Sequence, residues 1–172
     1  MEHSSPRDST QRPDAHATHP APHDGHHYRR LLLMAALSFA AMYGLMYAMV
    51  DAWANVYANL NQAYMAGLMT APLVVIELLL MRGMYRDRRR NLVILAASVL
   101  GGIACFALIR QQSAIGDRQF LRSMIPHHAG AILMCEQAPI RDSEIKALCK
   151  NIVSGQQAEI DQMKAKLSAL GR

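Results

Sequence analysis

The segment Phe120–Cys135 holds the residue types in this chain that are best suited to chemistry, above all Met124, His127 and His128. On an α-helix, residues three and four apart are neighbours, with about 5–6 Å between Cβ atoms. We therefore expect Met124 to lie beside both histidines. Thioether and imidazole donors together favour copper or zinc over magnesium or calcium. The spacing predicts a soft-metal site on one helix.

Two further methionines lie outside this first cluster. Met134 is seven residues beyond His127, about 10 Å along a helix axis, so we expect it in a second site, together with Cys135. Met163 lies on a second predicted helix. With a turn centred near residue 140, Met163 is about 15 Å from His128 along the axis. It then joins the histidines only through a partner chain or a longer turn.

The same register places Ile152 opposite His128 and Gln156 opposite Met124. It sets Cys135 and Cys149 about 6 Å out of axial register, which leaves a disulfide between them open without requiring one. Adjacent histidines on a helix also occur in purely structural roles. The alternative interpretation is a helical interaction module in which both histidines only pack or cap.

Three long apolar stretches precede this segment. Leu31–Val50 has no charged residue, Asn91–Ile109 has none, and Ala63–Met81 carries only Glu77. About 20 apolar residues cross a bilayer as a helix. The sequence therefore predicts an all-α protein with three transmembrane helices within residues 29–110.

Arginine indicates how these helices are oriented. The connection Arg82–Arg90 contains five arginines, and the connection Asp51–Gln62 contains neither Arg nor Lys. Lys and Arg are retained on the cytoplasmic side of a membrane. We therefore expect a multi-pass protein of a bacterial inner membrane, with a cytoplasmic N-terminus and a periplasmic C-terminal domain. The net charge of +5 comes largely from this cluster, so we expect no nucleic-acid partner.

Methionines recur at helical spacing within the first two predicted spans. Such a row could pass Cu(I) along a helix, but methionine is also an adaptable packing residue, and we interpret these side chains as packing residues. The methionines concerned are Met42, Met46, Met49, Met65 and Met69.

The two ends of the chain differ in character. Residues 1–28 are rich in His, Pro, Ser and Asp without apolar periodicity, which predicts a disordered tail. After a linker at residues 111–116, residues 117–172 predict a helical hairpin, with Asp142 or Ser143 as the N-cap of its second helix. Pro126 is expected to start or kink the first helix. Two such helices bury too little surface to be stable alone, so we expect a homodimer that completes a four-helix bundle, with cover from the membrane domain as the alternative.

Residues from about Asp117 to Leu167 resemble the small helical family called domain of unknown function three-zero-five, which is related to ferritin-like bundles. The matching positions are Phe120, Met124-Ile-Pro-His127-His128, Ala131, Met134, Glu144-Ile145, Leu148, Gln156, Glu159-Ile160 and Met163. The resemblance implies an extracytoplasmic copper-binding protein tied to copper tolerance. It implies Met124, His127, His128, Met134 and Met163 as metal ligands, and it gives Gln156 and Glu159 no settled role. Cys135 departs from the small residue common at its position. It adds either a thiolate ligand for the metal or a redox reaction that is not part of metal binding.

From these observations we expect a membrane-anchored periplasmic protein that binds Cu+ or Cu2+ for storage, sensing or transfer, with copper-handling proteins as partners. We expect no enzyme activity. Ferritin-like di-metal enzymes use Glu-x-x-His motifs, and residues 117–172 contain none.

Overall fold

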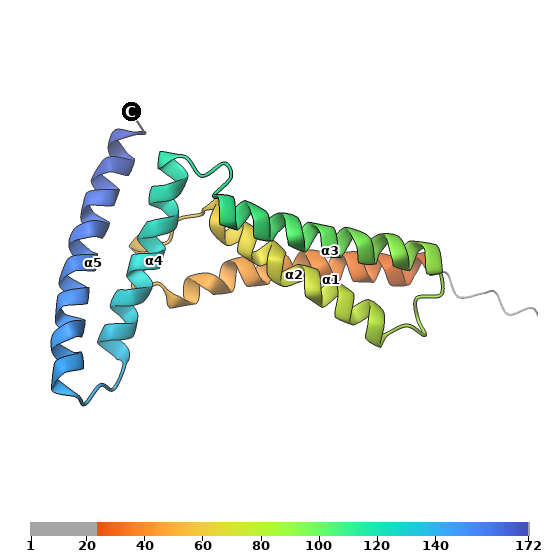
Figure 1. Ribbon diagram of the computed structural model, residues 1–172, viewed down its shortest axis with the longest axis horizontal. Helices are drawn as coiled ribbons and strands as arrows, with labels where there is room; N and C mark the ends of the chain where they lie inside the picture. Colours follow the sequence, from red (N-terminus) through yellow and green to blue (C-terminus); the bar gives the residue numbers. More distant parts are fainter. Residues whose placement is uncertain (1–23, 172) are drawn as a thin grey trace, which may run out of the picture.

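The computed structural model describes residues 24–171, and every regular element in this part of the chain is helical. The elements are α1 (Asp24–Leu45), η1 (Met46–Met49), η2 (Trp53–Asn55), α2 (Leu60–Leu80), α3 (Arg88–Gln111), α4 (Asp117–Gln137) and α5 (Ser143–Ala169). The predicted all-α fold is confirmed. Helices α1–α3 run alongside one another, and the α4–α5 hairpin crosses one end of them (Figure 1).

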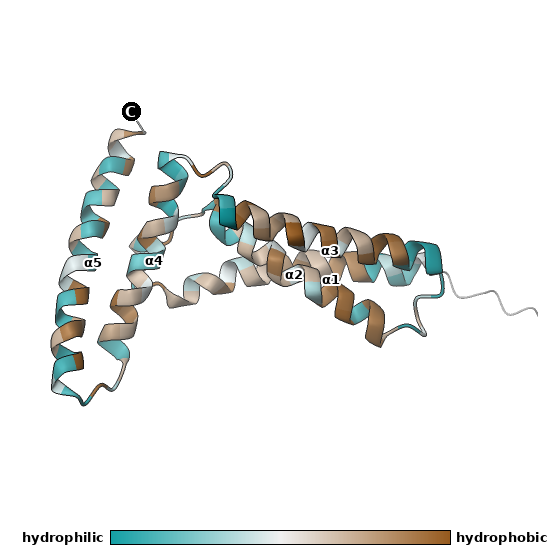
Figure 2. Cartoon of the chain, viewed as in Figure 1, coloured by the Kyte–Doolittle hydropathy of each residue, from teal (hydrophilic) through white to brown (hydrophobic). Residues whose placement is uncertain are grey.

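The helices α1–α3, here called the three-helix domain, are long and apolar enough to cross a membrane. The three candidate spans are Gly25–Met49, Leu60–Leu80 and Arg88–Gln111, so the predicted number of spans is confirmed. Figure 2 shows apolar colouring along α1–α3 and polar colouring over much of α5. About half of the large apolar side chains of α1–α3 are exposed, as expected of helices whose solvent is lipid rather than water.

Helix α2 is the central element of the three-helix domain, because α1 and α3 both pack against it and do not pack broadly on each other. Small residues allow α2 and α3 to approach closely. A Cβ atom added at Gly67 would lie 2.9 Å from Sγ of Cys105, and one at Gly102 would lie 3.1 Å from Cβ of Ala71. Such small residues are typical of helix contacts in membranes.

Polar side chains gather where α2 and α3 are connected, here called the arginine-rich end. The hydroxyl of Tyr28 donates to Oδ1 of Asn91 at 2.8 Å. The hydroxyl of Tyr85 donates to Oε1 of Glu77 at 3.5 Å. Burial, and after it the Glu77 carboxylate, raise the pKa of Tyr85. Glu77 is therefore not isolated within its helix, since a phenol from the connection reaches it.

The opposite end of the three-helix domain is shaped by a tightly bonded loop between η1 and α2. The hydroxyl of Tyr47 donates to the carbonyl oxygen of Tyr57 at 2.7 Å, and the backbone N–H of Asn59 donates to the hydroxyl of Tyr43 at 3.2 Å. Asn59 is the N-cap of α2, where its side chain accepts from the N–H of Gln62 at 2.9 Å. These bonds fix the surface on which the hairpin rests.

The chain then reverses direction between α3 and α4. Gln112 (φ 50°) and Ala114 (φ 60°) both adopt the left-handed backbone conformation, which is uncommon for residues other than glycine. The side chains of Asn61 and Gln112 exchange hydrogen bonds of 3.0 and 3.1 Å. Helix α4 starts at Asp117 and runs through Pro126, so the expectation that Pro126 starts the helix is wrong.

The hairpin has its own apolar core, formed by Ile125, Ala129, Ile132 and Ile160, all buried. The loop between η1 and α2 adds to it, because Val50 and Tyr57 pack against the same cluster. Residues of the predicted membrane domain, 29–110, thus cover part of the hairpin, which was the alternative to the dimer. The second copy expected to complete a four-helix bundle stays a prediction.

The register of the hairpin differs from the expected one. Nε2 of His128 contacts Oε2 of Glu159 at 2.7 Å, so Glu159 lies opposite His128 and the prediction of Ile152 is wrong by seven residues. A disulfide joins Cys135 to Cys149, with 5.2 Å between the Cα atoms. The physical reason is the turn. Its five residues, 138–142, are centred on residue 140 as expected, but the pairs Cys135–Cys149 and His128–Glu159 are centred on residues 142 and 143.5, so α5 is displaced along α4 from the symmetric register.

The other expectations at the helix ends have mixed outcomes. Asp142 is the N-cap of α5, as predicted, and its carboxylate accepts from the N–H groups of Glu144 and Ile145, both at 2.9 Å. Helix α1 begins at Asp24, so His26 and His27 belong to a helix instead of the predicted tail. The remainder of that predicted tail, residues 1–23, lies outside the described residues.

Candidate metal site

A cavity of about 520 Å³ lies where α4 rests on the three-helix domain, and we call it the junction cavity. Its lining comes from two sides. The three-helix domain and its loop contribute Met46, Met49, Val50, Asn59, Asn61, Gln62 and Met65. Helix α4 contributes Ser123, Met124, Pro126, His127, Gly130 and Met134.

Helix α4 is held on this surface by one close backbone approach and a few hydrogen bonds. A Cβ atom added at Gly130 would lie 3.3 Å from the carbonyl oxygen of Met49, so the missing side chain lets α4 approach η1. Nδ2 of Asn61 donates to the hydroxyl of Ser123 at 3.2 Å. The N–H of Leu60 donates to Oε1 of Gln119 at 3.1 Å. The contact is therefore specific, and it runs along α4 from Gln119 to Gly130.

The donor atoms of the cavity come from both sides of this contact. Among the predicted site residues, Met124, His127 and Met134 line one cavity, although the sequence had suggested two separate sites. Three methionines of η1 and α2 join them: Met46, Met49 and Met65. Five thioethers and one imidazole form a soft donor set, which suits Cu(I).

From their sequence pattern alone, these three methionines are expected to be packing residues. Their helical spacing was visible, but it does not distinguish a lipid-facing side chain from one at the end of a helix that another domain covers. Met49 remains 54% exposed and Met65 40% exposed, so neither is a typical core side chain. The loop that follows Val50 has no periodic sequence pattern, and it is this loop that brings Met49 and Met65 opposite α4.

Harder donors do not gather in the same way. Within residues 24–171, no three side chains of His, Cys, Asp or Glu converge so as to hold a metal ion. Structural zinc sites use four Cys or His ligands, and catalytic zinc sites add Asp or Glu. In the described part of the chain, the junction cavity therefore fits a thioether-bound ion better than it fits zinc.

The remaining predicted ligands, His128 and Met163, lie on the other side of α4. Nδ1 of His128 lies 2.9 Å from the carbonyl oxygen of Met124, and Nε2 contacts Glu159. Both ring nitrogens are thus engaged, and the rings of His127 and His128 are 6.2 Å apart, centre to centre. Met163 packs against the apolar core of the hairpin. Neither residue lines the junction cavity.

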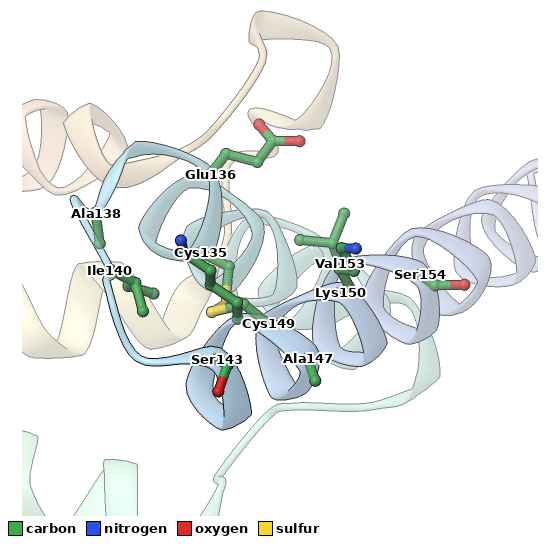
Figure 3. Close-up of a pocket in the computed structure, with 11 residues that line it drawn as sticks. Cys135, Glu136, Ala138, Ile140, Ser143, Ala147, Cys149, Lys150, Val153 and Ser154 are labelled. Atoms are coloured by element: carbon green, nitrogen blue, oxygen red, sulfur yellow. A yellow bond between two sulfur atoms is a disulfide. The ribbon is translucent and has the colours of Figure 1, made fainter.

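The two cysteines of the hairpin lie near its turn. Their disulfide borders a separate pocket of about 750 Å³ (Figure 3). Lys146 and Lys150 also line this pocket. As a disulfide, Cys135 carries no thiolate, so the thiolate ligand suggested for it is not available in this state. The remaining cysteine, Cys105, is free and half-buried.

Comparison with known proteins agrees with the division of the chain. Residues 104–167 match a family described as Domain of unknown function (DUF305). An uncharacterized protein of Acanthamoeba polyphaga mimivirus is 35% identical over 139 residues, which is 77% of this chain and 88% of the viral protein. That similarity extends well beyond the residues of the family match, so it includes part of the three-helix domain. No solved structure matches the chain. The chain belongs to the family of proteins that share this domain of unknown function.

Proposed function

We propose that this protein is a membrane-anchored copper-binding protein whose cargo is held in the junction cavity. The observation that carries the proposal is the gathering of five methionines and His127 around one cavity, from two parts of the chain. Copper binding to the resident donors would join α4 to the outer ends of α1 and α2. The site would therefore belong to the assembled protein and not to the hairpin alone.

The donor set favours Cu(I) over Cu(II). Thioethers are soft, neutral ligands that prefer Cu(I), whereas Cu(II) prefers nitrogen and oxygen donors. Thioethers also do not titrate, so protons do not compete with the metal at the five methionines. We therefore expect Cu(I) to be retained at mildly acidic pH, where a site made of histidines alone would release it.

We further propose that the hairpin lies in the periplasm of a bacterial inner membrane, with a cytoplasmic N-terminus. Two independent features support this placement. The arginine cluster lies at the far end of the three-helix domain, as the retention of positive charge on the cytoplasmic side predicts. The disulfide lies at the hairpin end, and disulfides persist in oxidising compartments. A phosphatase reporter fused after Arg172 should be active, and an inactive phosphatase would reverse the orientation.

The experiment that tests the copper site uses full-length protein in lipid nanodiscs, titrated with Cu(I) against a competing chelator. The variant Met46→Leu/Met65→Leu removes two thioethers from the cavity at nearly constant volume. Its matched control is Met42→Leu/Met69→Leu, which changes one methionine of α1 and one of α2 that do not line the cavity. We expect Cu(I) affinity to fall at least about tenfold, or about 1.4 kcal/mol, only in the first variant.

Equal Cu(I) affinity in both variants would show that the methionines of the junction cavity do not hold the metal. If, in addition, copper neither binds nor raises the melting temperature of the wild type, the protein is better described by the alternative function. That alternative is a membrane-anchored helical interaction module without a metal. A ligand that binds only the folded state must stabilise that state, so the melting temperature decides between the two.

A further inference from the structure

The arginine-rich end of the three-helix domain carries a second feature that copper binding does not use. A pocket of about 470 Å³ is lined by the polar residues Tyr28, Asp87, Arg89 and Arg90, together with Val93 and Ile94. An apolar groove of about 350 Å³ begins at the same place, because it shares Tyr28, Val93 and Ile94 with the pocket. Together they form one continuous amphipathic channel, here called the α1–α3 groove.

The groove exists because of how the helices pack. Helices α1 and α3 both rest on α2 and do not pack broadly on each other, so a furrow runs between them. Leu31, Leu32 and Ala35 form its α1 side, Ala97 belongs to its α3 side, and Val74 of α2 lies at its base. These residues lie within the candidate spans, so what surrounds the furrow is lipid and not water.

The mouth of the groove carries a net positive charge. Nε of Arg90 contacts Oδ2 of Asp87 at 3.0 Å, and the guanidinium group of Arg90 lies 5.7 Å from the ring centre of Tyr28. Among the described residues, Arg89 has no ion-pair partner. The lining of the pocket thus contains two guanidinium groups and one carboxylate. Arginine binds phosphate through paired N–H donors, and basic pockets between membrane helices are suited to anionic lipid headgroups.

We propose that the α1–α3 groove binds one anionic phospholipid, with its phosphate at Arg89 and Arg90 and one acyl chain along Leu32, Ala35 and Ala97. The two halves of the groove argue for this occupant together. Inorganic phosphate would satisfy the arginines but would leave the apolar furrow without a ligand. A zwitterionic lipid would fill the furrow but would gain less at the mouth, because its headgroup carries no net charge.

The test uses native mass spectrometry of the full-length protein, purified in detergent and mixed with equal amounts of phosphatidylglycerol and phosphatidylcholine. The wild type should retain phosphatidylglycerol preferentially. Arg89→Gln/Arg90→Gln should weaken that preference by about fivefold or more for each arginine. The matched control is Arg82→Gln/Arg86→Gln, which removes two exposed arginines of the same end that line neither part of the groove. The control should bind as the wild type does.

The acyl-chain half of the proposal has its own variant. Ala97→Phe places a ring in the furrow and should lower retention of phosphatidylglycerol while both arginines remain. Unchanged retention in this variant would overturn the groove as the lipid site. Equal losses in the two double arginine variants would overturn it as well, since that result reports only the overall positive charge. Displacement of the lipid by millimolar inorganic phosphate would show a simple anion site instead.

Discussion

His128 and Glu159 join the two helices of the hairpin, with 2.7 Å between Nε2 and Oε2. On the other side of the ring, Nδ1 lies 2.9 Å from the carbonyl oxygen of Met124. A carbonyl only accepts, so Nδ1 carries a hydrogen, and the contact with Glu159 requires a second proton on the ring or on the carboxyl group. The adjacent His127, by contrast, is exposed and lines the junction cavity.

The two neighbouring histidines should therefore have opposite phenotypes. His128→Ala should lower the free energy of unfolding by about 1–3 kcal/mol, because it removes a bond between α4 and α5, and it should leave Cu(I) affinity nearly unchanged. His127→Ala should lower Cu(I) affinity and leave stability nearly unchanged. Thermal melts and chelator competition on both variants measure the two quantities. The reverse pattern would assign the metal to the α4–α5 interface.

The disulfide should stabilise the hairpin. Closing a loop of 14 residues between Cys135 and Cys149 removes conformational freedom from the unfolded chain, which is worth about 3 kcal/mol. A reducing agent should therefore lower the melting temperature of the wild type. Cys135→Ser/Cys149→Ser should melt at this lower temperature with or without the agent. Cys105→Ala serves as the control, since it should respond to the reducing agent as the wild type does.

Gly130 should be required for the contact between α4 and η1. Its missing Cβ would lie 3.3 Å from the carbonyl oxygen of Met49, so Gly130→Ala needs a small shift and Gly130→Leu pushes the helix away. We expect Gly130→Leu to lower Cu(I) affinity strongly and Gly130→Ala to lower it slightly. Disulfide formation between Asn61→Cys and Ser123→Cys reports the same contact. If the two cysteines still join as fast in Gly130→Leu, the close approach is not required.

The packing of α2 against α3 should depend on a small residue at position 67. A Cβ atom there would lie 2.9 Å from Sγ of Cys105, so Gly67→Ala should destabilise the three-helix domain by about 1–3 kcal/mol. Cys105→Ala removes the obstructing sulfur and should restore most of the loss in the double variant. A double-mutant cycle on unfolding in detergent measures this coupling. Additive effects would show that the two positions do not meet.

The helices of this protein follow directly from its sequence, because long uncharged stretches and a capping residue such as Asp142 act locally. The register of the hairpin does not follow so simply. Apolar residues on α5 recur every seven positions, so pairing His128 with Ile152 or with Glu159 brings the same face of α5 onto α4. The conformation of the turn, and not its length, chooses between the two registers, and its five residues have no periodic pattern.

The residues of the candidate site were even harder to predict from the sequence than the register of the hairpin. Met124 and His127 were apparent because they are neighbours on one helix. Met46 and Met65 were not, because only the loop after η1 and the reversal at Gln112 and Ala114 bring them near α4. A contact between segments that are far apart in the sequence leaves no spacing to count.

Helix α5 packs broadly on α4 alone, and none of its residues lines the junction cavity. The proposed metal ligands and the mechanical support of α4 thus belong to different helices. A foreign α5 that kept the residues facing Ile125, Ala129 and Ile132 could replace the native one without altering the metal preference. Selection on α5 would then act only on how well it packs against α4, which leaves its outward surface free to diverge.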